Sequence, residues 1–302
     1  MRIGISLTSA YTVDDPREGA RRMIDRAAAA RSAGLDSLFV GDHHATGPGT
    51  YYQNVPIMGR LIAEWGDGPV GALFLLPLWH PVLLAEQVAT LASIARGRFI
   101  MQCAIGRDDA QFTGMGVNAK FRPSLFEETL DIVRRLWAGE TVDANHRHRF
   151  TGACIGPLPP EPIDVWVGAS ASGAIDRAAR LGDGWIADPT YGTKELAAQS
   201  AEYLERAQAY GRPPKAVTVR RNVYVGATDE AAAAVVDPVL AQFSGDRMTL
   251  LYGSPETVAS RIRELARLGF TDVLVRSLVP DHRETLRSLE RLAEVRERVA
   301  DA

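Results

Sequence analysis

Three polar residues stand together at the end of a short apolar segment near the N-terminus. The segment 37–41 reads SLFVG and is followed directly by Asp42, His43 and His44. A histidine transfers protons near neutral pH because its ordinary pKa is about 6.5, and a carboxylate such as Asp42 can hold one tautomer of the ring. This pattern indicates acid–base chemistry, with His43 and Asp42 as the catalytic candidates. The alternative is a structural histidine that bonds a neighbouring loop.

A run of small residues follows another apolar segment in the middle of the chain. Residues 163–167 (IDVWV) lead into Gly168, Ala169, Ser170, Ala171 and Ser172. Small side chains let a ligand approach the backbone closely. The helical pattern that begins next would place its first N–H groups, which lack intrahelical acceptors, at the positive end of the helix dipole. The loop therefore suits a phosphate, although Ser170 or Ser172 as a simple helix cap is the alternative.

A third group of candidates surrounds residues 98–104, for which we expect a strand. Gln102 and Ala104 share one face of that strand because side chains alternate. The small residue at 104 and Gly106 beyond it leave room for a flat ligand, with ordinary core packing as the alternative. Arg122 opens a later helix and is a candidate anion contact, whereas a single arginine at such a position is more often solvated.

Composition excludes several classes of function. The net charge is −3 and no basic cluster is present, which argues against a nucleic-acid partner. The two cysteines, Cys103 and Cys154, lack metal-ligand spacing and are expected to be free thiols in a reducing cytoplasm. No apolar run approaches the ~20 residues that span a membrane, and the N-terminal residues suit a strand rather than a signal peptide. His146 and His148 have the spacing of a metal pair but lie in an expected exposed excursion, so we expect no metal.

Hydrophobic patterning predicts the elements that position these residues. Eight strands are expected at 3–7, 37–41, 70–76, 98–104, 163–167, 185–187, 216–225 and 272–277, and they alternate with eight principal helices. Strict alternation predicts a parallel sheet, and the count of eight favours a closed (β/α)8 TIM barrel over an open sheet. We expect one domain over residues 1–302, with insertions at about 139–162 and 228–252. The carboxyl ends of the strands would then carry the candidate residues on one rim.

Four segments carry a family resemblance. They are GLDSLFVGDHH (34–44), LPLWHPVLLAEQVATLASIARGRF (76–99), VWVGASASGAIDRAARLGDGWIAD (165–188) and GSPETVASRIRELARLGFTDVLVR (253–276). In order and spacing the sequence resembles the bacterial luciferase-like flavin-dependent monooxygenases and their deazaflavin (F420)-dependent relatives. The resemblance implies a luciferase-like barrel with the cofactor phosphate at 169–172, and the cofactor ring near strands three and four, and so near Leu73. It also implies His43 as the active-site histidine and a non-prolyl cis peptide near 72–74.

The sequence departs from the family pattern at three positions. Gly173 replaces the threonine that follows Ser-Ala-Ser in relatives of luciferase, so one phosphate contact is expected to be missing. Ala104 and Ile105 match the positions of a cysteine and an arginine in luciferases, so light emission is not implied.

The resemblance implies a flavin-dependent oxidoreductase. The Ser-Ala-Ser loop favours a monooxygenase that uses reduced FMN, supplied by a separate flavin reductase, and O₂ on a small organic substrate. F420-dependent hydride transfer is the alternative, followed by a non-catalytic flavin-binding barrel and a metal-dependent hydrolase. The resemblance also implies a homodimer packed through the second and third helices. The loop with Tyr51 and Tyr52 and the excursion at 141–162 are expected to shape the substrate pocket.

Overall fold

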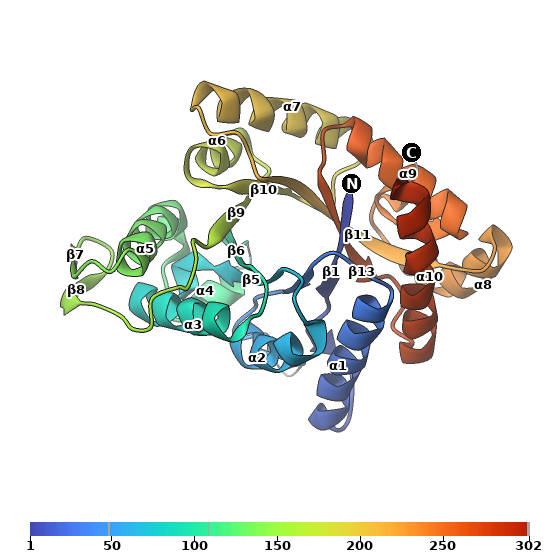
Figure 1. Cartoon of the computed structure of the whole chain (residues 1–302), viewed down its shortest axis with the longest axis horizontal. Coiled ribbons are helices and arrows are strands. Elements are labelled where there is room, and N and C mark those ends of the chain that lie inside the picture. The colour runs from blue at the N-terminus through green and yellow to red at the C-terminus, as the bar shows by residue number, and fades with distance from the viewer. Residues whose placement is uncertain (48, 108, 301–302) are drawn as a thin grey trace. The chain divides into compact units, whose positions relative to one another are not determined.

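The computed structural model describes residues 1–47, 49–107 and 109–300. Strands and helices alternate along the chain (Figure 1). The eight principal strands are β1 (Arg2–Leu7), β3 (Leu38–Val40), β5 (Val70–Leu75), β6 (Phe99–Ala104), β9 (Asp164–Gly168), β10 (Gly184–Ala187), β11 (Ala216–Val225) and β13 (Asp272–Ser277). Together with the short β12 (Leu251–Gly253) they belong to one sheet, and an additional pairing of β10 with β11 closes it. The fold is the predicted (β/α)8 TIM barrel.

Residues close to the helix ends determine where the helices begin. The principal ones are α1 (Pro16–Ser32), α2 (Asn54–Trp65), α3 (Pro81–Ile94), α5 (Arg122–Trp137), α6 (Ser172–Leu181), α7 (Thr193–Ala209), α9 (Pro255–Arg267) and α10 (His282–Ala300). Asp15 caps α1 by accepting a hydrogen bond from Arg17 N, and Pro16 is the first residue of the helix. Gly192 is the N-cap residue of α7, and Thr193 begins the helix.

The chain forms two compact units, of which the first comprises residues 1–8, 15–39 and 166–302. Within it β9, β10, β11, β13 and β1 pair in that order, and each pair is parallel. Arg2 lies opposite Asp272 in register and donates two hydrogen bonds of 2.7 Å to its carboxylate. Trp185 stacks on Tyr203 at a centroid distance of 5.1 Å and is fully buried, which anchors β10 against α7.

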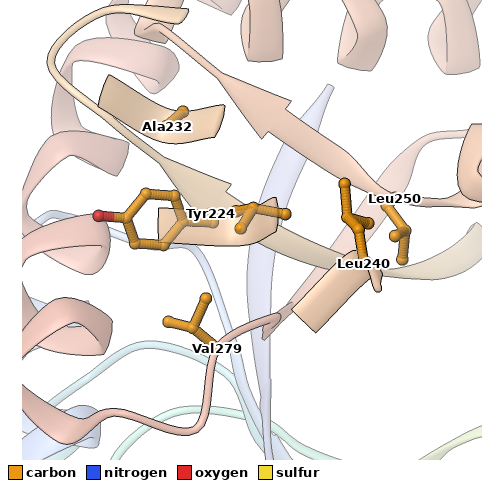
Figure 2. Packing of buried hydrophobic residues seen from close by; sticks show 6 residues of the cluster. Tyr224, Ala232, Leu240, Leu250 and Val279 are labelled. Atoms are coloured by element: carbon orange, nitrogen blue, oxygen red, sulfur yellow. The ribbon is translucent and has the colours of Figure 1, made fainter. Parts of the chain in front are cut away.

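The predicted insertion near residue 230 forms helix α8 (Asp229–Leu240) on a small apolar cluster of its own. The buried members of this cluster are Tyr224, Ala232, Val236, Leu240, Leu250 and Val279, most of which Figure 2 labels. The carboxylate of Asp229 accepts hydrogen bonds from Ser254 N at 2.6 Å and Thr257 Oγ1 at 3.0 Å. The start of α8 is therefore tied to the start of α9.

The second unit comprises residues 9–14 and 40–165. Its strands β5 and β6 pair in parallel along their whole length, in register at Ala72 with Met101, and at Phe74 with Cys103. These four side chains are fully buried. The peptide bonds of residues 72–74 are trans, so the cis peptide expected there is absent. Among the described residues, the cis bond lies between Gly156 and Pro157.

The excursion expected at 139–162 contains a hairpin, β7 (Val142–Asn145) with β8 (Arg149–Ala153). Glu128 on α5 holds its turn, because the carboxylate accepts hydrogen bonds from the N–H groups of Arg147 and His148 and contacts His146 Nδ1 at 3.0 Å. Burial raises the pKa of Glu128, but these hydrogen bonds outweigh it and the net pKa is lowered. No helix in the described residues is long and apolar enough to cross a membrane.

Candidate active site

Asp42 follows β3 and is completely buried in the second unit. Its Oδ2 accepts hydrogen bonds from Leu75 N and from Trp79 Nε1, both at 2.8 Å, and its Oδ1 lies 3.2 Å from His44 Nε2. The carboxylate therefore joins the end of β3 to the end of β5. Asp42 was expected to orient the imidazole of His43. In this geometry its carboxylate lies beside the ring of His44 instead, and a different residue contacts the ring of His43.

His43 is exposed, but one side of its ring is fixed. Its Nδ1 lies 3.0 Å from Nε2 of Gln111, and the ring meets Tyr51 edge to face at a centroid distance of 5.3 Å. Gln53 Nε2 donates a hydrogen bond of 3.0 Å to the main-chain oxygen of His43. Gln111 lies in the six-residue helix α4 (Asp109–Gly114) and is 4% exposed. Gln111 could not be predicted from the sequence, because such a short helix has no periodic signal and the contact spans 68 residues.

Tyrosines form a wall beside His43. Strand β2 (Ala10–Tyr11) pairs antiparallel with β4 (Thr50–Tyr51), and Tyr11 meets Tyr52 edge to face at 5.8 Å. Tyr52 N also donates a hydrogen bond of 3.0 Å to Ser9 O. Of the predicted pocket residues, Tyr51 thus meets His43 and Tyr52 meets Tyr11, and the contact of either tyrosine with a substrate stays a prediction.

An apolar, partly exposed face lies on β5 and β6 in the same unit. Leu73 stands opposite Gln102, and Leu75 stands opposite Ala104. Leu73 and Ala104 keep part of their surface exposed and pack against a buried group that contains Leu75, Leu78 and Phe112. Gly106 has φ +75°, and a Cβ there would lie 3.1 Å from the Phe112 ring. The face suits a flat ligand.

Gln102 supplies a test of that fit. Its side chain is buried, and within the described residues its Nε2 has no hydrogen-bond partner. An unpaired buried donor is costly unless a ligand or water accepts from it. A flavin or deazaflavin ring offers acceptors at its edge, so this polar atom beside the apolar face is compatible with either group.

Arg122 is committed to the loop after β6. Its Nη1 lies 3.4 Å from Gly106 O and 3.3 Å from Arg107 O, and its Nη2 is 3.0 Å from Asp109 Oδ1. The guanidinium also lies over the Phe112 ring at 5.3 Å. Arg122 therefore fixes the loop that carries Gly106, and its predicted contact with the cofactor stays a prediction.

The small-residue loop belongs to the first unit, where it joins β9 to α6. Ala169 is held from both sides, because its N–H donates to Ile186 O at 3.1 Å and its oxygen accepts from Trp185 Nε1 at 2.9 Å. Gln199 Nε2 donates to Ser170 O at 3.1 Å. Among the described residues no protein acceptor is bonded to the N–H groups of residues 170–173. The loop is therefore fixed through Gly168, Ala169 and Ser170 and presents four N–H groups to an anion.

The two loop serines do not cap α6. The N-cap residue is Ala171, and no side chain bonds the first N–H groups of the helix. The hydroxyl of Ser172 instead donates to Glu202 Oε1 at 2.5 Å and accepts from Arg206 Nη2 at 2.8 Å. The capping alternative is therefore wrong. At Gly173 an added Cβ would meet nothing within 4 Å, so the loop is open where relatives of luciferase have threonine.

The two units each hold part of the predicted site. His43, Asp42, Leu73, Ala104, Gly106 and Arg122 lie in the second unit, and Gly168, Ala169, Ser170, Ala171 and Ser172 lie in the first. The donor N–H groups of the loop fit a phosphate, and the β5–β6 face fits a planar ring. Within the part of the chain that the structure describes, no three His, Cys, Asp or Glu side chains are grouped so that they could hold a metal ion.

Comparison with known proteins decides the family. The sequence profile of the family described as luciferase-like monooxygenase matches residues 1–250 of this chain. The chain belongs to the luciferase-like monooxygenase family. Its curated relatives and structural neighbours carry the names of oxidoreductases: dehydrogenases, a monooxygenase and a reductase.

Curated relatives of this luciferase-like protein are named for their use of F420. An F420-dependent glucose-6-phosphate dehydrogenase of Nakamurella multipartita is 28% identical over 187 residues, which are 58% of this chain and 54% of the relative. The enzyme of the same name from Beutenbergia cavernae is 32% identical over 52% of this chain and 49% of its own length. An F420-dependent hydroxymycolic acid dehydrogenase of Mycobacterium tuberculosis is 27% identical over 70% of this chain and 61% of its own. The chain thus spans about half the length of the first curated relatives that it matches.

Solved structures agree on the fold. Monooxygenase RslO1 from Streptomyces bottropensis superposes with a TM-score of 0.85 at 21% identity, over 97% of this chain and 98% of that one. The oxygenating constituent of 3,6-diketocamphane monooxygenase from Pseudomonas putida, solved with FMN, gives 0.86 at 18% identity, over 99% of this chain and 98% of that one. An F420-dependent secondary alcohol dehydrogenase gives 0.81 at 17% identity, with the same two coverages. At these identities the similarity concerns the luciferase-like fold alone.

Proposed function

We propose that this chain is an F420-dependent oxidoreductase that transfers a hydride to or from a small organic substrate. The observation that carries the proposal is the shared cofactor in the names of its curated relatives, which are F420-dependent dehydrogenases from several genera. The expectation of FMN came from the Ser-Ala-Ser loop alone. The curated relatives align over much longer segments than this three-residue loop, and they are therefore a better guide to the cofactor than the loop.

The chain's own residues divide the work of binding. The N–H groups of residues 170–173 would hold a cofactor phosphate, because they face no protein acceptor and lie at the positive end of α6. Leu73, Ala104 and Gly106 would lie against the ring, with Gln102 Nε2 as the polar contact. When bound, the deazaflavin supplies the hydride chemistry.

His43 would exchange a proton with the substrate or donate a hydrogen bond to its oxygen. It is exposed while its ring orientation is fixed by Gln111 and Tyr51. A ring that is already oriented pays little entropy to engage a ligand, which is a condition for efficient proton or hydrogen-bond chemistry. The wall of Tyr11, Tyr51 and Tyr52 would contact the substrate beside it.

An FMN-dependent monooxygenase is the second candidate. The observation that favours it is the loop Ser170-Ala171-Ser172, which matches luciferase relatives except at Gly173. In that case a separate flavin reductase would supply reduced FMN, and the site would use O₂.

Titration of the purified protein with F420 and FMN, each oxidised and reduced, tests the proposal. Tighter binding of F420, with substrate turnover that continues without O₂, supports hydride transfer. Tighter binding of reduced FMN, with turnover that stops without O₂, supports the second candidate instead. Binding of neither cofactor contradicts both.

A matched pair of variants locates the ring site. Ala104→Leu fills the β5–β6 face and should weaken binding of the preferred cofactor at least tenfold, which corresponds to about 1.4 kcal/mol. Ala241→Leu adds the same side chain at an exposed position in the first unit and should leave binding unchanged. Equal affinities of the two variants would contradict the placement of the ring at Ala104.

A further inference from the structure

The amide of Gln111 bridges the two adjacent histidines. Its Oε1 lies 2.9 Å from the main-chain N of His44, and its Nε2 lies 3.0 Å from Nδ1 of His43. Gln111 is 4% exposed, so water does not compete freely for either group. The amide has one donor end and one acceptor end, so the direction of each bond can be worked out from its partner.

The direction of the amide is fixed by the backbone. The main-chain N–H of His44 can only donate, so it must face the oxygen of Gln111. The NH₂ group then faces His43, and because NH₂ can only donate, Nδ1 of His43 must accept. A ring nitrogen that accepts carries no proton. In the neutral ring the proton is therefore on Nε2.

The same contact disfavours the other two states of the ring. The charged imidazolium and the opposite tautomer both carry a proton on Nδ1, which would point at the N–H of the amide. Reversing the amide would relieve that clash but would turn its NH₂ toward the N–H of His44. Either arrangement leaves a buried donor without an acceptor, which is unfavourable.

We propose that Gln111 is a positioning residue that holds His43 as a neutral imidazole with its proton on Nε2, so that His43 donates a hydrogen bond to an acceptor oxygen of the substrate. A neutral N–H cannot take a proton from a hydroxyl group. The substrate group that faces Nε2 is therefore an acceptor oxygen, and a carbonyl is the class whose oxygen gains charge when hydride adds to its carbon, so His43 stabilises that charge rather than acting as a base. This role rests on the proposed function, whereas the tautomer does not.

Nitrogen NMR measures the tautomer directly. The full chain, without cofactor, is labelled with ¹⁵N-histidine, and long-range ¹H–¹⁵N spectra are taken at a mildly alkaline pH where free imidazole is neutral. His43→Gln identifies the signals of His43 among the six histidines. We expect a protonated Nε2 and a bare Nδ1. A protonated Nδ1, or fast averaging of the two forms, would overturn the proposal.

Three variants separate positioning from a merely structural role. Gln111→Glu keeps an acceptor for His44 N–H and replaces the donor with a carboxylate oxygen, so the proton should move to Nδ1 of His43. Gln111→Met removes both groups, and the two tautomers should average. Gln53→Met is the control, because the side chain of Gln53 donates to the main-chain oxygen of His43, and the tautomer should not change.

The outcomes are distinct even where one variant fails to fold. If Gln111→Glu keeps the Nε2 proton, Gln111 does not set the tautomer. If Gln111→Glu does not fold, the spectra of the wild-type protein and of Gln111→Met decide between a fixed and a free ring. Because these spectra need no cofactor, a failed cofactor titration would refute the proposed function and leave the tautomer result standing.

Discussion

Substitution of Asp42 by alanine should loosen the junction between β3 and β5. The buried carboxylate accepts from Leu75 N and Trp79 Nε1 and lies beside His44. Alanine leaves both donors without this acceptor, at about 1–3 kcal/mol for each buried group. Trp79 is partly exposed, so water replaces the lost acceptor and the cost at Trp79 lies at the low end of that range. The expected loss is about 2–4 kcal/mol of unfolding free energy, and Asp42→Asn, which keeps one oxygen acceptor, should lose less.

Two measurements check this prediction. Urea unfolding, followed by circular dichroism and by tryptophan fluorescence, gives the loss of stability and shows whether both probes report one transition. Hydrogen exchange at the Leu75 amide reports the broken contact itself, and exchange there should accelerate in Asp42→Ala. Asp131→Ala is the control, because Asp131 is mostly exposed on α5 and surface changes usually stay within about 0.5 kcal/mol.

One result would refute the reasoning. If Asp42→Ala is as stable as Asp131→Ala and the Leu75 amide stays protected, Asp42 is not the group that joins the two strands. A loss of stability with unchanged exchange at Leu75 would place the damage elsewhere, most directly at His44, which then becomes the residue to substitute.

Two further predictions concern a glycine and a histidine. Gly106→Ala forces an L-residue to φ +75° and its Cβ to 3.1 Å from the Phe112 ring. It should lower the unfolding free energy by about 1–3 kcal/mol, which is measured as a lower melting temperature. Gly173→Ala, whose Cβ meets nothing, should be close to neutral by the same measurement. Burial lowers the pKa of His148, which lies 2.9 Å from Thr129 Oγ1. Folding therefore favours the neutral ring of His148. The protection factors of the hairpin amides should be at their full value above pH 6.5 and should fall as the pH drops below it. His148→Gln should remove that dependence on pH.

Much of the fold follows from local signals in the sequence. The limits predicted for β11 and β13 coincide with those observed, because both strands carry valines at alternating positions and are bounded by breaks in the pattern. The cap at Asp15 was predictable because an N-cap aspartate followed by proline satisfies the first turn from within a few residues. Where a boundary is set by the residues themselves, the sequence is sufficient.

The parts that could not be predicted depend on distant partners. Hairpin β7–β8 is held by Glu128, about 20 residues earlier on another element, and nothing in the hairpin's own residues reveals that partner. The tie between Gln111 and His43 spans 68 residues. The orientation of Asp42 toward His44 depends on donors from Leu75 and Trp79, which only the packed chain brings within reach.

The paired histidines show how environment divides one residue type into two roles. His44 is half-buried, lies beside the carboxylate of Asp42 and meets Trp79 edge to face at 5.5 Å, so its ring belongs to the packing. Its main-chain N–H, however, orients the amide of Gln111, and that amide bonds His43. The anchor at Asp42 and His44 thus extends through Gln111 to the exposed ring of His43. Substitution of Asp42 should therefore disturb the tautomer of His43 although the two side chains are not bonded to each other in the described structure. Substitution of Gln53 should leave the tautomer unchanged.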